Sequence, residues 1–141
     1  MPEALAEAAN LVVRPLHPVF GAEVTVRDRA GSAATVAAEI ERCLATAGLV
    51  VIRDVALDDA GLARFAGHFG PLQDLAPGAE PPGIFHVTNL DEHGNLRAAD
   101  DPSRLRHEAN KLWHVDSSFI APGVTYSFLH ARIVPEADKD T

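Results

Sequence analysis

The sequence is poor in cysteine, in aromatic residues, in basic residues and in long apolar runs. Its 141 residues include one cysteine, one tryptophan, one tyrosine and six phenylalanines. The lone Cys43 excludes an internal disulfide, and the acidic opening segment lacks the basic and then apolar pattern of a secretory signal, so we expect a cytoplasmic protein. No apolar run reaches the roughly 18 residues that cross a bilayer, so we expect no membrane partner.

The charge balance argues against one further class of partner. Twelve lysines and arginines stand against twenty aspartates and glutamates, for a net charge of −8. Binding to a phosphate backbone needs a basic surface, so we expect no nucleic acid. Hydrophobic residues make up 47% and charged residues 23%, which is typical of a chain that folds. The length and the absence of repeats predict a single domain over residues 1–141.

Two stretches show the spacing of amphipathic helices. The first follows Ser32 or Thr35, either of which can cap a helix, and ends at Gly48. The second follows Asp58 and ends at Gly70. The apolar positions are Val36, Ile40, Leu44 and Ala47 in the first stretch, and Leu62, Phe65, Ala66 and Phe69 in the second.

Most of the remaining chain has the composition of strands and turns. Residues 11–26 are β-branched but interrupted by proline and glycine, and residues 49–54 form a short continuous apolar run. Residues 84–90 read as a strand before a turn, and residues 112–135 read as two strands around an Ala-Pro-Gly turn. Residues 97–111 are polar and predict an irregular surface segment, with room for one helical turn. This order of elements predicts an α+β fold whose main body is a sheet or sandwich.

One pair of residues has the spacing of metal ligands. His114 and Asp116 are two positions apart, and in a strand such residues project to the same face. A site with two histidines and one carboxylate needs such a pair from one strand and a second histidine from elsewhere. About one His-x-acid pair is expected by chance in a chain of this composition, so the spacing alone is weak evidence. The alternative is a structural histidine, bonded to Asp116 or to the backbone, beside a core Trp113.

The surrounding sequence resembles the taurine/2,4-dichlorophenoxyacetate dioxygenase (TauD/TfdA) family of Fe(II)- and 2-oxoglutarate-dependent oxygenases. The resemblance covers nearly the whole chain, and the WHVDSSF segment is more similar to the aryloxyalkanoate branch than to the taurine branch. The matching segments, in order, are HPVFGAEVT (17–25), GLVVIRDV (48–55), FAGHFGPL (65–72), TNLDEHGN (88–95), LWHVDSSF (112–119), YSFLHARIVP (126–135) and the terminal DT.

The resemblance implies a fold and a reaction. The fold would be a partial double-stranded β-helix, of the jelly-roll or cupin-like kind, with two flanking N-terminal helices. The reaction would hydroxylate a small organic anion, similar to an aryloxyalkanoate or a sulfonate, using O2 and releasing succinate and CO2 from 2-oxoglutarate. Association into a homo-oligomer is left open.

The resemblance also implies roles for individual residues. His114 and Asp116 match the first two iron ligands, and Thr141 matches a threonine whose hydroxyl helps hold the distal carboxylate of 2-oxoglutarate. Asn110 matches a position near the substrate, although an asparagine that caps a loop turn is an equal alternative. The chain has Asp-Lys at 138–139 where family members usually have Gly-Gly, which is a departure close to Thr141.

The family's second histidine ligand and its 2-oxoglutarate arginine fall beyond the point where this sequence stops. His130, which follows on the next predicted strand, is interpreted as structural or surface-exposed and not as the third ligand. We therefore expect the N-terminal portion of a dioxygenase domain, C-terminally incomplete, with weak iron binding and no turnover of its own. Two alternatives remain: a non-catalytic binding module derived from the same fold, and a half-site subunit that another chain completes.

Overall fold

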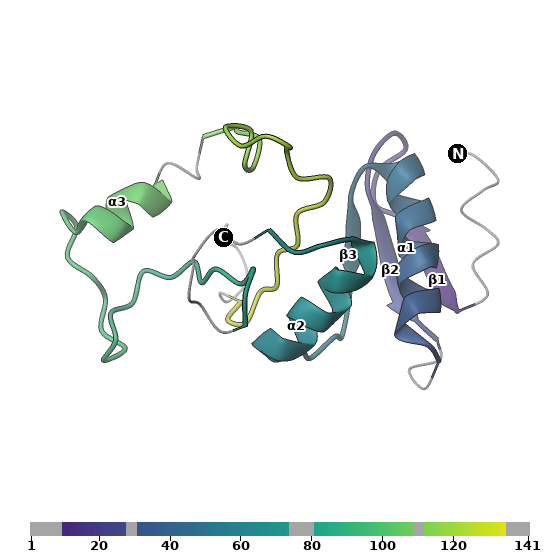
Figure 1. Ribbon diagram of the computed structural model, residues 1–141, viewed down its shortest axis with the longest axis horizontal. Coiled ribbons are helices and arrows are strands. Elements are labelled where there is room, and N and C mark those ends of the chain that lie inside the picture. Colours follow the sequence, from purple (N-terminus) through teal and green to yellow (C-terminus); the bar gives the residue numbers. More distant parts are fainter. Residues whose placement is uncertain (1–9, 28–30, 74–80, 109–111, 135–141) are drawn as a thin grey trace. The chain divides into compact units, whose positions relative to one another are not determined.

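The computed structural model divides the chain into two compact units, Met1–Leu72 and Gln73–Thr141, which are described separately. The elements and their order along the chain are labelled in Figure 1. None of the helices among the described residues is long and apolar enough to cross a membrane. The described residues are 10–27, 31–73, 81–108 and 112–134.

The first unit is built on a three-stranded sheet in the order β1-β2-β3. Strands β1 (Leu11–Pro15) and β2 (Ala22–Val26) pair antiparallel, and β2 pairs parallel with β3 (Val50–Ile52). The predicted extended segment 11–26 is thus a hairpin, as its interrupting prolines and glycine indicate. The run at 49–54 does form a strand, but a shorter one of three residues.

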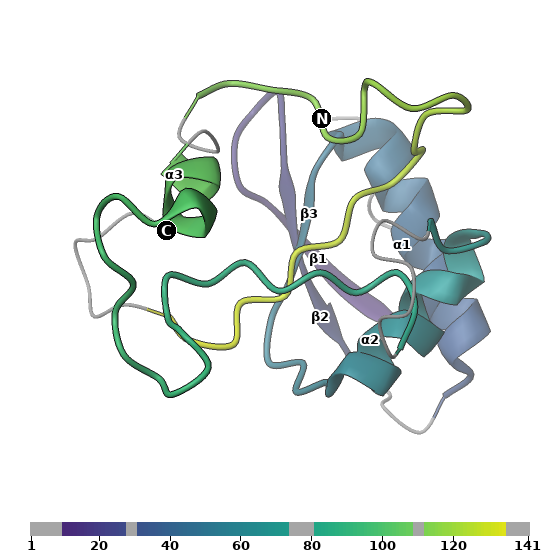
Figure 2. The same ribbon diagram turned by 60° about the vertical axis from the view of Figure 1, so that its left-hand side comes forward.

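Helix α1 (Ala33–Ala47) connects β2 to β3 and lies along one side of the sheet (Figure 2). Its predicted ends are confirmed, because Ser32 occupies the N-cap and Gly48 the C-cap. Gly48 has a φ of 71°, and its backbone N–H donates to the Leu44 carbonyl oxygen at 2.8 Å. A left-handed residue at this position is reached most easily by glycine, so Gly48 ends the helix at the residue that the sequence indicates.

The core of this unit lies between α1 and the sheet. It contains five buried side chains, and the apolar spacing of the helix places three of them there. Cys43 is 4% exposed and packs as a small buried hydrophobe, and its burial raises the pKa of the thiol. The cluster is formed by Leu11, Val24, Val36, Ile40 and Cys43.

Helix α2 (Asp59–Ala66) begins at the predicted cap. The Asp58 carboxylate accepts a hydrogen bond from the Gly61 backbone N–H at 2.6 Å, which satisfies one of the free donors of the first turn. A 3-10 turn, η2 (Gly67–Phe69), extends the helix to Gly70, where the sequence predicts its end. Phe65 and Phe69 pack edge to face, with ring centroids 5.5 Å apart, against the core below α1.

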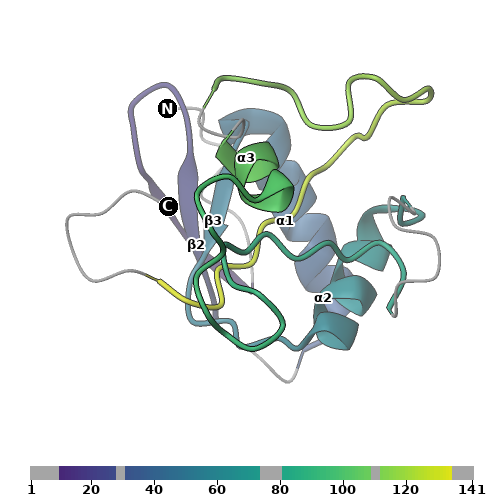
Figure 3. The same ribbon diagram turned by 90° about the vertical axis from the view of Figure 1, so that its left-hand side faces the viewer.

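The second unit contains one helix, α3 (Pro102–Glu108), among otherwise non-repetitive described segments (Figure 3). The Asp101 carboxylate accepts hydrogen bonds from the Ser103 and Arg104 backbone N–H groups at 2.8 and 3.2 Å. The expectation of an irregular segment at 97–111 is therefore corrected: an aspartate cap followed by proline begins a two-turn helix.

The strand predicted at 84–90 is also wrong. The turn after it does form, since the Asp91 carboxylate accepts from the His93 and Asn95 backbone N–H groups, but only one bridge, between Leu90 and Leu96, follows it. The two strands predicted within 112–135 do not form among the described residues. A strand forms only where a second segment pairs with it, and the described part of this unit has no pairing beyond that single bridge, so strand composition alone does not produce a strand.

Candidate metal centre

The segment from Leu112 to Asp116 carries the predicted ligands on extended backbone that belongs to no strand. Trp113 is fully exposed, so the alternative is wrong in placing it in the core, but His114 does bond to the backbone and to Asp116, as that alternative also expects. His114 and Asp116 nevertheless point to each other, as the two-residue spacing predicts.

Two contacts of His114 fix the direction of its ring. Its Nδ1 lies 2.8 Å from the Leu112 carbonyl oxygen, and its Nε2 lies 3.0 Å from Oδ1 of Asp116. A carbonyl oxygen only accepts, so Nδ1 carries the proton and donates it to Leu112. In the neutral ring the lone pair is then on Nε2, directed at the Asp116 carboxylate. A metal-bound histidine is commonly held by such a bond from its other ring nitrogen to a backbone carbonyl.

The same contacts change the pKa of His114. The pKa of His114 is raised, first by its hydrogen bond to the Leu112 carbonyl and then by the negative charge of Asp116. Both side chains are about half exposed, at 47% and 57%, so water screens their attraction. A divalent cation at this position would compete with a proton for Nε2.

The spacing of the two donor atoms fits a common metal ion. Nitrogen and oxygen ligands lie about 2.0–2.2 Å from a first-row divalent ion, so two ligands at right angles are about 3 Å apart. The 3.0 Å between Nε2 and Oδ1 agrees with this value. One imidazole and one carboxylate are two of the three ligands of a facial triad. Among the described residues, however, no group of three or more His, Cys, Asp or Glu side chains is assembled, so the donor set there stops at two.

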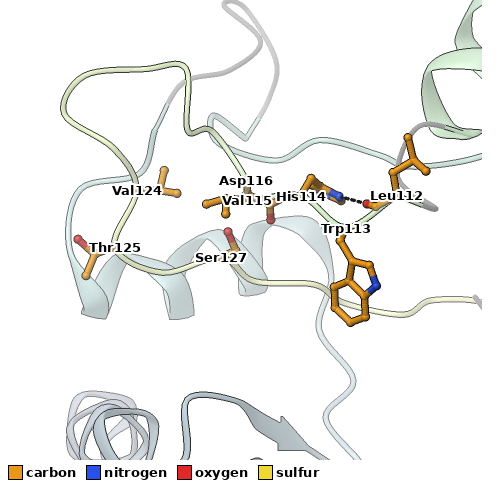
Figure 4. Close-up of a pocket in the computed structure, with 8 residues that line it drawn as sticks. All are labelled: Leu112, Trp113, His114, Val115, Asp116, Val124, Thr125 and Ser127. Atoms are coloured by element: carbon orange, nitrogen blue, oxygen red, sulfur yellow. Dashed lines mark hydrogen bonds and ion pairs between the residues drawn. The ribbon is translucent and has the colours of Figure 1, made fainter.

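The pair lies in an open pocket of about 580 Å³ (Figure 4). Two segments of the second unit form its walls: 112–116 on one side and 124–127 on the other. The Ser127 hydroxyl points toward the segment that carries Asp116 (Figure 4). The lining residues are Leu112, Trp113, His114, Val115, Asp116, Val124, Thr125 and Ser127.

The other predicted site residues are not brought together in the same way. Asn110 and Thr141 lie outside the described residues. His130 is partly buried and is not among the residues that line the pocket, and its Nδ1 is buried without a hydrogen-bond partner. This placement agrees with its interpretation as a structural residue.

Sequence reasoning missed two parts of the site. The Leu112 carbonyl is a backbone group, and the leucine side chain gives no sign that this carbonyl bonds to His114. The wall formed by Val124, Thr125 and Ser127 could have been inferred from the Ala-Pro-Gly turn, which predicts that the chain after it returns alongside the segment before it.

Comparison with known proteins gives a family and several relatives. A family model described as "Taurine catabolism dioxygenase TauD, TfdA family" matches residues 12–141. An alpha-ketoglutarate-dependent 2,4-dichlorophenoxyacetate dioxygenase of Cupriavidus pinatubonensis is 33% identical over 142 residues, covering 94% of this chain and 49% of the relative. The dioxygenase of the same name from a Burkholderia strain is 29% identical, covering 89% of this chain and 45% of the relative. The chain thus spans about half the length of the curated relatives it matches.

A solved structure is similar as well. The crystal structure of AAD-2 in complex with Mn(II) and N-oxalylglycine matches with a TM-score of 0.65 and 30% sequence identity. The match covers 77% of this chain and 37% of that chain. The mixed α/β fold of the described residues is therefore one that a metal-binding protein also has.

Proposed function

Because the chain belongs to the taurine catabolism dioxygenase TauD, TfdA family, we propose that it is part of an Fe(II)- and 2-oxoglutarate-dependent dioxygenase. The observation that carries the proposal is the 3.0 Å approach of His114 Nε2 to Asp116 Oδ1 in an open pocket. The similar AAD-2 structure, which holds Mn(II) and N-oxalylglycine, an analogue of 2-oxoglutarate, supports the same metal and cosubstrate type.

The residues of this chain prepare the metal position. When bound, Fe(II) with 2-oxoglutarate and O2 supplies the oxidation of a C–H bond, with succinate and CO2 as the other products. His114 presents a nitrogen lone pair and Asp116 a negative charge that neutralises part of the ion's charge. The Leu112 carbonyl holds the proton on Nδ1, so that Nε2 remains the ligand atom.

We propose further roles for two residues outside the described segments. Thr141 would help hold the distal carboxylate of 2-oxoglutarate, and Asn110 would lie near the substrate. The substrate is proposed to be a small organic anion of the aryloxyalkanoate type, because both curated relatives are named for 2,4-dichlorophenoxyacetate. A sulfonate is the second candidate.

We also propose that residues 1–141 act as the N-terminal portion of one dioxygenase domain whose jelly roll is completed by further sequence. Two observations support this: the described residues assemble two donors and not three, and the segments with strand composition at 84–90 and 112–134 have no partner strands there. The isolated chain would then bind metal weakly and form no succinate. The same proposal includes a cytoplasmic location. It also includes a small-molecule substrate, with no nucleic-acid or membrane partner.

The ligand pair is tested by titrating Mn(II) into the 141-residue chain while following the electron paramagnetic resonance signal of free Mn(II). We expect His114→Ala to weaken binding by at least about tenfold, because one of two protein ligands is lost. His93→Ala is the matched control, since His93 is an exposed turn residue outside the pocket lining. Equal loss in both variants, or no loss in His114→Ala, would rule out His114 as a ligand.

The half-site and non-catalytic alternatives predict different results in metal binding, sedimentation and succinate release. A half-site subunit completed by a second copy binds Mn(II) more tightly as protein concentration rises, with a dimer in sedimentation analysis. A non-catalytic module retains its partner or metal binding but releases no succinate even when the rest of a dioxygenase is supplied.

A further inference from the structure

The turn that follows Asp116 contains an unusual backbone conformation. Ser117 has a φ of 52°, in the left-handed region that side chains other than glycine rarely enter. Among the described residues, only Asp54 shares this feature outside glycine, and aspartate tolerates the region better than serine does. An outlier of this kind is energetically costly and persists where the surrounding structure requires it.

The position of Ser117 shows what the conformation achieves. The Ser117 carbonyl oxygen accepts a hydrogen bond from the Ile120 backbone N–H at 3.1 Å, which closes a turn directly after Asp116. The chain then passes through the Ala-Pro-Gly turn and returns, so that Val124 and Ser127 face the segment that carries His114 (Figure 4). Extended backbone at Ser117 would not allow this turn to close.

We infer that Ser117 is a positioning residue for the metal site. Its left-handed backbone sets the direction in which the chain leaves Asp116. This direction keeps the Asp116 carboxylate and the wall at 124–127 close to His114. This inference rests on the proposed function, because it assigns the residue to the same metal site. The backbone of Ser117 carries the role, and its hydroxyl does not.

The role of the backbone can be separated from that of the hydroxyl by two substitutions. Ser117→Thr keeps the hydroxyl but adds a branch at Cβ, which makes the left-handed region costly. Ser117→Gly removes the hydroxyl and makes the same region easy to reach. Ser118→Thr is the matched control, since it places the same branch one residue later, at a position that is not left-handed.

The first measurement is Mn(II) affinity in the full 141-residue chain. We expect Ser117→Thr to bind Mn(II) about fivefold more weakly or worse, and Ser117→Gly and Ser118→Thr to remain within about twofold of the unchanged chain. Far-UV circular dichroism, dominated by α1, checks that each variant folds. Weak binding by Ser117→Gly, or unchanged binding by Ser117→Thr, overturns the inference.

The second measurement needs no metal, and it separates failure of this inference from failure of the proposed function. Nuclear Overhauser contacts between 112–116 and 124–127 report directly whether the two walls lie close together. We expect these contacts to weaken in Ser117→Thr and to persist in Ser117→Gly. If the unchanged chain binds no Mn(II) but the contacts follow this pattern, the proposed metal site fails, and what stands is the role of Ser117 in placing the two walls. Identical contacts in all variants overturn the positioning role.

Discussion

At the residue scale, the candidate site shows which contacts a sequence can predict. The approach of His114 to Asp116 follows from their two-residue spacing and survives even though no strand forms around them. The bond from His114 to the Leu112 carbonyl could not be predicted, because any residue offers the same carbonyl. The left-handed Ser117 could not be predicted either, since serine gives no signal for that conformation.

A second residue-scale contact ties the start of β1 to helix α1. Glu39 is 4% exposed, and its carboxylate accepts hydrogen bonds from the Asn10 backbone N–H at 3.1 Å and from Asn10 Nδ2 at 2.9 Å. We expect Asn10→Ala to lower the free energy of unfolding by about 1–3 kcal/mol, because a buried carboxylate loses a partner. Urea melts followed by circular dichroism measure this loss. The exposed Asn95→Ala serves as control, and an equal effect there would contradict the assignment.

The surface charges of the sheet predict a dependence on pH. The pKa of Glu23 is lowered by hydrogen bonds from Arg53 first and from Arg14 second. Because the folded pKa is the lower one, the stabilisation is complete above the unfolded value and is lost as the pH falls through the folded value.

We expect Glu23→Gln to flatten the decrease in unfolding free energy between about pH 5 and pH 3. Melts at several pH values test this, and they should be run at low salt, because salt screens exposed ion pairs. An unchanged slope in the variant would show that Glu23 contributes nothing to the acid sensitivity.

At the element scale, α1 and α2 were predictable, whereas α3 and the missing strand pairings were not. The limits of α1 and α2 follow from Asp58, Gly48 and the apolar spacing, all of which act within a few residues. The strands at 84–90 and 112–135 depend on partners elsewhere, and composition cannot show whether those partners are present. Alternation nevertheless persists at 124–130, where the even positions are more buried than the odd ones.

The end of α1 allows a matched comparison of two glycines. Gly48 has a φ of 71°, and a Cβ there would lie 3.0 Å from Cε2 of Phe20. Gly67 has a φ of −60°, and nothing lies within 4 Å of a Cβ there. We expect Gly48→Ala to cost about 1–2 kcal/mol of unfolding free energy, and Gly67→Ala to be neutral or to stabilise by about 0.4–1 kcal/mol. Thermal melts of the two variants measure these changes, and equal effects of the two substitutions would contradict the left-handed cap at Gly48.

At the scale of the whole molecule, the two units differ in the interactions that stabilise each of them. The first has paired strands and a buried cluster, whereas the described residues of the second have one helix and extended segments with many exposed apolar side chains, including Trp113, Phe119 and Leu129. Large exposed apolar surface of this kind is characteristic of an interface that is normally covered. This contrast is consistent with the proposal that further sequence completes the domain.

Amide hydrogen exchange tests that proposal directly. In the isolated chain we expect slow exchange at Val24 and Ile40 and fast exchange at the amides of 124–130, which belong to no strand. In a chimera that adds the part of the Cupriavidus relative this chain does not match, the same amides should become protected as strands pair. Protection that does not change between the two proteins would argue against completion of a shared sheet.

The same chimera provides the most direct test of the central claim, that His114 and Asp116 supply two of the metal ligands of a dioxygenase. The measurement is succinate formed from 2-oxoglutarate in the presence of Fe(II), O2 and 2,4-dichlorophenoxyacetate. The account predicts O2-dependent succinate from the chimera, loss of at least about a hundredfold in its His114→Ala variant, and none from the isolated chain. Succinate that persists unchanged in the His114→Ala chimera, or a folded chimera that binds Mn(II) yet forms none, would contradict it.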